Sequence, residues 1–150
     1  GHPVTLVDRQ TEALLDLEPD LRATVIQADL EDGSPWPLNE KFAGVVVVNY
    51  LHRPLTENLL ESLEPGGLLI YETFARGNEN FSRPRNPDHL LKSGELLQVV
   101  LGRLQIIAYE HGIREKSPLK GVIQRICAVN NLDQSVREDR EPQVLNLEPN

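Results

Sequence analysis

The sequence contains no methionine and only one cysteine, Cys127. A single cysteine cannot form an internal disulfide and is too few for a cysteine-rich metal site, so we predict neither, and we expect Cys127 to be inert packing. Scarce cysteine is typical of a reducing compartment, and we expect a cytoplasmic protein. Because a translated chain begins with Met, the start at Gly1 predicts a chain shortened at its amino terminus.

Positive charge is also scarce, since 15 Lys and Arg stand against 23 Asp and Glu, for a formal net charge of -8. A nucleic-acid backbone or an anionic membrane surface would be repelled, so we expect neither as a partner. No apolar run approaches the length of a membrane-spanning helix, and no signal peptide is recognisable. The 150 residues, 39% of them hydrophobic, are enough for one domain with its own core, and a small molecule is the expected partner.

The chain also lacks the G-x-G-x-x-G loop that binds phosphates in many nucleotide-binding proteins. It does have a series of short apolar strands, each followed by a polar residue. These are Val4–Val7 with Asp8, Ala23–Ala28 with Asp29, Val45–Val48 with Asn49, and Leu68–Tyr71 with Glu72. In open parallel α/β sheets, ligands bind beyond the carboxyl ends of the strands, so this series predicts a nucleotide-type site.

Between these strands, apolar residues at helical spacing predict helices over 11–17, 54–63 and 90–100. The valine run of Phe42–Asn49 predicts an interior parallel strand covered on both faces. Pro65-Gly66-Gly67 is expected to end the second helix in a tight turn. The polar loop over 75–89 is typical of a lid or binding loop. Two closing strands are predicted over 104–109 and 122–129, with antiparallel pairing.

The segment Leu63–Thr73 reads L-E-P-G-G-L-L-I-Y-E-T and resembles the L-x-P-G-G-x-L segment before the fifth strand of class I S-adenosylmethionine-dependent methyltransferases. Asp8 resembles the acidic residue that closes their second strand, and Ala28–Leu30 resembles their adenine-side turn after the third. The Arg83–Pro87 loop is similar to that of small bacterial members near the tellurite-resistance methyltransferases. The resemblance covers about residues 4–129.

The resemblance implies an α/β fold, a Rossmann-like three-layer αβα sandwich whose mostly parallel sheet has the strand order 3-2-1-4-5-7-6. The family's first strand, glycine-rich loop and first helix have no counterpart in this sequence. We therefore expect residues 1–130 to form a partial methyltransferase domain, and the acidic residues 131–150 to be a tail or linker. The absent strand is central, where unpaired strand edges are costly, so an upstream segment, the tail or a second copy in a homodimer would fill the gap, or the sheet would close up.

The cofactor implied by the resemblance is S-adenosylmethionine. The residues expected to bind it are Asp8, Arg9, Asp29, Leu30, Asn49 and Tyr50. Asp8 would accept both ribose hydroxyls, or would instead cap the helix from Thr11. Asp29 would bond the adenine amino group while Leu30 packs on the ring, the alternative being ordinary turn chemistry.

Asn49 and His52 are the candidate catalytic residues. Asn49 would orient the cofactor's amino acid portion or the nucleophile, or would instead cap the helix over 54–63. His52 could take a proton from the acceptor as a general base, since imidazoles in general can exchange protons at neutral pH, the alternative being a plain surface histidine.

The loop after the fourth strand concentrates positive charge on an acidic chain. Its cationic residues are Arg76, Arg83, Arg85 and His89. Guanidinium groups bind carboxylates and oxyanions with two parallel hydrogen bonds, so Arg83, Arg85 and His89 are expected to bind a small anionic acceptor. The alternative is that these cations pair with acids nearby, namely Glu72, Glu79 or Asp88.

The implied reaction is an in-line displacement at a sulfonium-bound methyl group, which depends mainly on alignment and needs little acid or base help. A nicotinamide dehydrogenase would also place an acid after its second strand, but should carry the glycine fingerprint. A noncatalytic methyltransferase-like binding or scaffold protein is the other alternative, because the glycine loop supplies backbone donors and a helix N-terminus to the cofactor's carboxylate. We expect these 150 residues alone to bind S-adenosylmethionine weakly or not at all.

Overall fold

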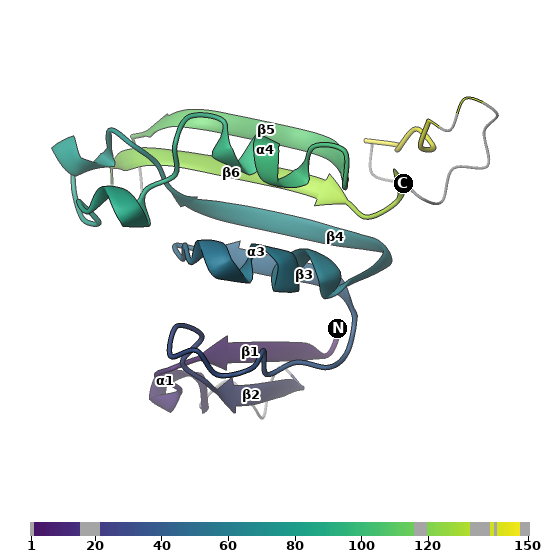
Figure 1. Ribbon diagram of the computed structural model, residues 1–150, viewed down its shortest axis with the longest axis horizontal. Coiled ribbons are helices and arrows are strands. Elements are labelled where there is room, and N and C mark those ends of the chain that lie inside the picture. Colours follow the sequence, from purple (N-terminus) through teal and green to yellow (C-terminus); the bar gives the residue numbers. More distant parts are fainter. Residues whose placement is uncertain (1, 16–21, 116–119, 133–138, 140, 148–150) are drawn as a thin grey trace. The chain divides into compact units, whose positions relative to one another are not determined.

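The computed structural model describes residues 2–15, 22–115, 120–132, 139 and 141–147 (Figure 1). The chain divides into two compact units, Gly1–Asn39 and Glu40–Asn150. No helix in the described ranges is long and apolar enough to cross a membrane.

The first unit contains a parallel pair of short strands, β1 (Val4–Asp8) and β2 (Ala23–Gln27). Its register runs from Val4 opposite Ala23 to Asp8 opposite Gln27. Parallel neighbours require a crossover connection, which contains the short helix α1 (Glu12–Leu15). Both strands were predicted to within one residue at each end. Residues 16 and 17 of the predicted helix lie outside the described residues.

The second unit contains a four-stranded sheet in the order β3-β4-β6-β5. Its strands are β3 (Phe42–Val48), β4 (Leu63–Phe74), β5 (Gln105–Arg114) and β6 (Gly121–Val129). The first two are parallel, whereas β6 lies between β4 and β5 and is antiparallel to both. The predicted antiparallel pairing of the closing strands is therefore confirmed.

Helices α3 (Thr56–Glu61) and α4 (Glu95–Val100) lie on one side of this sheet (Figure 1). A 3₁₀ turn, η1 (Arg53–Leu55), leads into α3, and two more, η2 (Asn78–Asn80) and η3 (Pro87–His89), lie in the loop after β4. Helix α4 begins five residues later than predicted. The reason is that Leu91 is extended and exchanges backbone hydrogen bonds with Phe74 and Arg76, so the helix cannot start before Gly94.

The main core of the second unit lies between helices α3 and α4 and the face of the sheet that they cover. Its most deeply buried members include Leu69, Leu96, Val100, Ile126 and Ala128, each at most 2% exposed. Side chains on the other face of the sheet are more open, since Val46 is 66% exposed and Val48 is 55% exposed.

The prediction that β3 is an interior strand covered on both faces is wrong for the described sheet. It pairs with β4 in parallel, as predicted, but has no second neighbour among the described residues of that sheet. Its valines alternate between buried Val47 and exposed Val46 and Val48. A run of β-branched residues predicts a strand, but it does not record how many neighbours the strand has.

The Pro-Gly-Gly segment forms an irregularity within β4 and does not end α3. The helix stops at Glu61, where Ser62 bonds back to the carbonyl of Asn58, and Leu63 already pairs with Phe42. The register then shifts before Leu68 pairs with Gly44. A Cβ on Gly67 would lie 2.8 Å from two backbone oxygens, so no larger residue fits there without a shift of the backbone.

Candidate functional site

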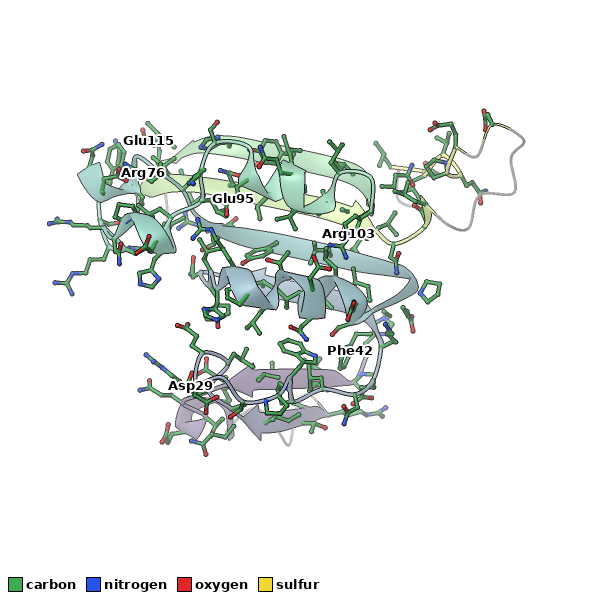
Figure 2. The ribbon with its side chains drawn as sticks, viewed as in Figure 1. Asp29, Phe42, Arg76, Glu95, Arg103 and Glu115 are labelled. Atoms are coloured by element: carbon green, nitrogen blue, oxygen red, sulfur yellow. The ribbon has the colours of Figure 1, made fainter. Side chains whose placement is uncertain are left out.

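In the first unit, two acidic side chains lie at the carboxyl end of the parallel pair. Asp8 is the last residue of β1 and lies opposite Gln27, the last residue of β2, and Asp29 follows two residues later. The Ala28 N–H donates to the Asp8 carbonyl at 3.0 Å, which ties the two strand ends together. Figure 2 labels Asp29 at this end of the unit. The structure thus brings both predicted cofactor-binding acids to one edge.

Both carboxylates form tight turns and are exposed. The Asp8 Oδ1 accepts from the Gln10 N–H at 2.8 Å, and the Asp29 Oδ1 accepts from the Glu31 N–H at 2.9 Å. The hydrogen bond made by Asp8 does not cap α1, because that helix begins at Glu12. The hydrogen bond made by Asp29 is the ordinary turn chemistry that was the alternative to a role in binding adenine.

A carboxylate has two oxygens, and the described residues occupy only Oδ1 of each acid. Each can therefore still accept from a ligand hydroxyl or amino group. Of the neighbouring candidates, Arg9 is exposed, with its carbonyl accepting from Gln27 Nε2 at 3.1 Å, and Leu30 is half-buried. A polar acceptor pair beside an apolar side chain suits a nucleoside.

In the second unit, Asn49 directly follows β3 and has a left-handed conformation with φ +54°. Asparagine adopts this conformation more readily than most residues, and it turns the chain away from the sheet. The Asn49 N–H donates to the Glu72 carbonyl at 2.9 Å, so β3 ends opposite Glu72, two residues before the end of β4. Asn49 is exposed and does not cap the following helical segment, because His52 holds the N-cap position of η1.

Tyr50 and His52 are half-buried in the connection between Asn49 and η1. The Tyr71 hydroxyl donates to the Tyr50 carbonyl at 2.9 Å and so fixes this connection to β4. Burial, followed by electrostatic interaction with Tyr50 and Glu95, raises the pKa of Tyr71 from 10.0 to about 12, so its hydroxyl remains a donor even in alkaline solution. The carbonyl of His52 accepts from the Leu55 N–H at 3.1 Å, which places the histidine at the first turn of η1.

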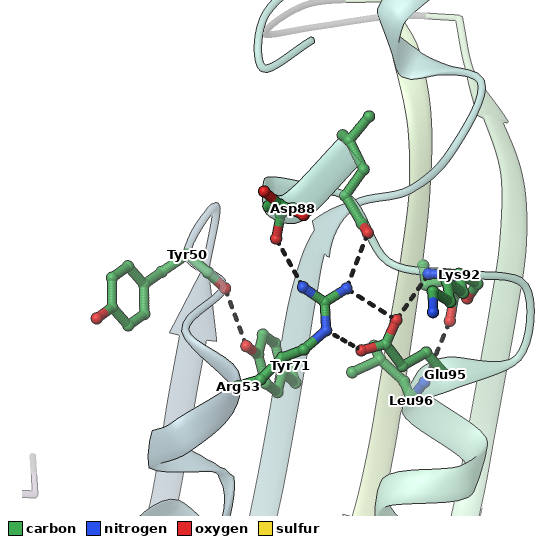
Figure 3. A network of polar contacts seen from close by, with 9 residues as sticks. Tyr50, Arg53, Tyr71, Asp88, Lys92, Glu95 and Leu96 are labelled. Atoms are coloured by element: carbon green, nitrogen blue, oxygen red, sulfur yellow. Dashed lines mark hydrogen bonds and ion pairs between the residues drawn. The ribbon is translucent and has the colours of Figure 1, made fainter. Parts of the chain in front are cut away.

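Arg53 joins this connection to the loop before α4 (Figure 3). It makes two bonds to Glu95, from Nε to Oε1 at 2.7 Å and from Nη2 to Oε2 at 3.1 Å. It also donates to the backbone carbonyls of Asp88 at 2.6 Å and Leu90 at 3.1 Å. The hydrogen bond to Glu95 is the largest of the effects that raise the pKa of Arg53. Sequence reasoning missed Arg53, because its partners lie 35 to 42 residues further along the chain.

The loop after β4 is held at its other end by Asn78, which is fully buried. Its Nδ2 donates to the carbonyls of Ser82 and Pro84, and its Oδ1 accepts from the Val122 N–H at 3.2 Å. Both polar atoms of its side-chain amide thus bond to backbone groups, and they join the loop to the start of β6. Gln124, also fully buried, does the same at the start of α4, where its Nε2 donates to the Lys92 carbonyl at 2.6 Å.

The three cationic residues predicted to bind an anion project from this loop. Arg83, Arg85 and His89 are exposed, and none forms an ion pair with another described residue. Two of the acids considered as alternative partners pair with other arginines. Glu79 pairs with Arg76 at 3.1 Å, so the alternative holds for that fourth cation of the loop, and Glu72 pairs with Arg114 at 2.5 Å.

Comparison with known proteins found no matching family model and no matching curated protein. Solved structures do match. TehB from Haemophilus influenzae superposes with a TM-score of 0.69 at 14% identity, covering 87% of this chain and 51% of TehB. The N-methyltransferase NodS from Bradyrhizobium japonicum WM9 gives 0.62 at 16% identity, covering 86% of this chain and 74% of NodS. A methyltransferase from Methanosarcina mazei superposes with a TM-score of 0.60 at 16% identity, covering 87% of this chain and 83% of the methyltransferase.

These matches show a fold. The chain has the α/β Rossmann-like fold of class I S-adenosylmethionine-dependent methyltransferases, as the resemblance at residues 63–73 implied. It spans about half the length of TehB.

Proposed function

We propose that this chain takes part in methyl transfer from S-adenosylmethionine to a small anionic acceptor. The observation that carries the proposal is the strand order. The family order 3-2-1-4-5-7-6, without strand 1, leaves 3-2 and 4-5-7-6, which correspond to the observed β2-β1 and β3-β4-β6-β5. Of the four strands in the second unit, β6 alone runs against the others, which agrees with the mostly parallel sheet that the resemblance implies.

In this proposal, the residues at the strand ends hold the cofactor. Asp8 and Arg9 bind the ribose, and Asp29 and Leu30 bind the adenine. Asn49, with Tyr50 beside it, orients the amino acid portion. NodS, one of the structures of similar fold, was solved with S-adenosyl-L-homocysteine. When bound, the cofactor supplies a methyl group on a positively charged sulfur.

The residues of the second unit then act on the acceptor. Arg83, Arg85 and His89 bind its negative charge, because guanidinium groups pair with oxyanions bidentately. His52 accepts the proton that an acceptor hydroxyl or amine loses as its bond to the methyl carbon forms and the carbon–sulfur bond breaks. Holding nucleophile, carbon and sulfur in line supplies most of the rate.

The proposal extends to the organisation of the chain. Residues 1–130 form a partial methyltransferase domain of the three-layer type, and residues 131–150 form an acidic tail. No glycine-rich loop occurs in the 150 residues, so the backbone donors that such a loop offers must come from elsewhere. A second copy of the chain in a homodimer is one source of a neighbour for β3.

Calorimetric titration with S-adenosylhomocysteine tests the cofactor site. We expect the 150 residues to bind weakly, with a Kd above about 100 μM, and Asp8→Asn to weaken that binding further. Asp32→Asn is the matched control, because Asp32 also forms a turn through Oδ1, to the Ser34 N–H at 2.8 Å, but is not a predicted ligand.

Binding that is equal in Asp8→Asn and in the unsubstituted chain would contradict the assignment of Asp8. A low micromolar Kd for the unsubstituted chain would contradict the argument from the absent glycine loop. Complete lack of binding at millimolar ligand would favour the noncatalytic scaffold, which the absent loop also supports.

A further inference from the structure

Arg53 differs from an ordinary surface ion pair in what its guanidinium contacts. Two of its four hydrogen bonds go to backbone carbonyls, those of Asp88 and Leu90, which lie on either side of His89. The other two go to Glu95, whose Oε2 also accepts from the Lys92 N–H at 2.7 Å. The side chain thus fixes the direction of the backbone at the end of the loop (Figure 3).

The contacted backbone is a well-anchored part of the loop. Leu90 and Leu91 are at most 1% exposed, and Leu91 bonds to the Phe74 carbonyl at 3.0 Å. Asn78 holds the segment up to Pro84 at the other end. The stretch between these two anchors contains Arg85 and His89, and Arg83 immediately precedes Pro84.

Arg103 provides an internal comparison. It also makes a two-bond ion pair, to Glu57 at 2.7 and 2.9 Å, and its side chain is as exposed as that of Arg53, at 40%. Among the described residues, its guanidinium donates to Glu57 and to no loop carbonyl. Figure 2 labels Glu95 at one end of α4 and Arg103 beyond the other. The two pairs therefore share their charges and the number of hydrogen bonds, but Glu95 is less exposed than Glu57, at 17% against 64%, and only Arg53 contacts the cationic loop among the described residues.

We propose that Arg53 is a positioning residue for the anionic acceptor, acting through the loop that presents Arg83, Arg85 and His89. The inference rests on the proposed function, because it assigns the loop a ligand. Arg53 does not touch the acceptor. It sets the direction in which the cationic side chains point by bonding the carbonyls on both sides of His89, and it does so from the segment that carries Asn49 and His52. It thereby couples the acceptor loop to the candidate catalytic residues.

Amide hydrogen exchange on the full chain tests the positioning directly. The His89 and Leu90 amides are suitable reporters, because they donate to Asn86 and Pro87 within η3 at 3.0 and 3.1 Å. We expect Arg53→Gln to accelerate their exchange about tenfold or more, and Arg53→Lys to accelerate it less, since a lysine can replace some of the donors. Arg103→Gln should leave both rates unchanged. Equal rates in Arg53→Gln and Arg103→Gln would overturn the proposal.

Titration with inorganic sulfate, followed by NMR on the arginine side-chain signals, tests the consequence for anions. We expect Arg53→Gln to weaken sulfate binding about fivefold, with partial rescue in Arg53→Lys and no change in Arg103→Gln. The double variant Arg83→Gln/Arg85→Gln tests the anion loop itself, because it removes both guanidinium groups. If that variant loses sulfate binding while Arg53→Gln keeps the affinity of the unsubstituted chain, the loop binds anions but Arg53 does not position it. No sulfate binding by the unsubstituted chain would contradict the anion loop itself, while the exchange rates would still decide what Arg53 does.

Discussion

At the scale of single residues, the loop after β4 is organised by buried amides and one ion pair. Asn78 and Gln124 are both fully buried, and each satisfies loop backbone groups that would otherwise be costly to bury. Neither residue stands out in the sequence, because a polar residue in a loop or in an apolar strand gives no sign of how deeply its side chain is buried. Arg53 and Glu95 add the charged contact that fixes the loop's other end.

The Glu95 carboxyl predicts a dependence of stability on pH. Burial acts to raise its pKa, but hydrogen bonds from Arg53 and the Lys92 N–H outweigh this, so the pKa lies below the ordinary 4.5. A lowered pKa means that Glu95 stabilises the fold above about pH 4.5, and that this contribution is lost as pH falls below that value. In urea unfolding at a series of pH values, Glu95→Gln should show a shallower loss of stability below pH 5 than the unsubstituted chain.

Glu61→Gln is the control for that experiment, since it removes the same charge from an exposed position at the end of α3. An equally steep acid loss in Glu95→Gln and in the unsubstituted chain would show that the ion pair with Arg53 contributes nothing to folding.

At the scale of elements, the Pro-Gly-Gly segment is the part of β4 where the backbone is most constrained. Gly66 has φ +81°, and Gly67 approaches the carbonyls of Glu64 and Phe42. Asn130, directly after β6, holds the segment from the far side, since its N–H donates to the Gly67 carbonyl at 2.8 Å and its carbonyl accepts from the Gly66 N–H at 2.6 Å.

We therefore expect Gly67→Ala to lower the free energy of unfolding by about 1–3 kcal/mol, the usual cost of forcing an atom into occupied space. Gly112→Ala is the matched control, because a Cβ there meets nothing within 4 Å. Equilibrium urea unfolding measures the free energy of unfolding of both variants. Equal values would show that the backbone around Gly67 shifts to accommodate a Cβ at no cost.

The sequence was sufficient for features that depend on local patterns, and insufficient for those that depend on distant partners. The bounds of β1 and β2 follow from short apolar runs closed by polar residues. The extension of β4 back to Leu63 depends on pairing with Phe42, and the late start of α4 depends on the bridge between Leu91 and Ala75. At the candidate site, Asp8 and Asp29 could be proposed from the sequence because they follow strands, whereas Arg53 is recognisable only through its partners across the fold.

At the scale of the whole chain, the two units differ in how much apolar surface they bury. The buried hydrophobic residues of the described chain run from Val47 to Val129, all of them in the second unit. The described part of the first unit has a two-stranded sheet and one buried residue, Thr11. A pair of short strands is marginally stable without further packing.

Native-state hydrogen exchange should resolve this difference. We expect amides of β1 and β2, such as Leu6 and Val25, to exchange at least about tenfold faster than those of Leu69 and Ile126, because local opening is easiest where few apolar contacts are lost. Exchange of all four amides at a common rate would show that the two units open together.

The direction of β6 has a practical consequence. Because β6 runs antiparallel to β4, it ends with Val129 opposite Leu68, and Asn130 then bonds to Gly66 and Gly67. The chain thus leaves the sheet at the edge opposite to Asn49 and Glu72, which lie together at the other end of β3 and β4. An affinity tag or surface tether carried on the chain after Asn130 would be joined to the sheet at the end away from Asn49, which suits sensor-based measurements of small ligands.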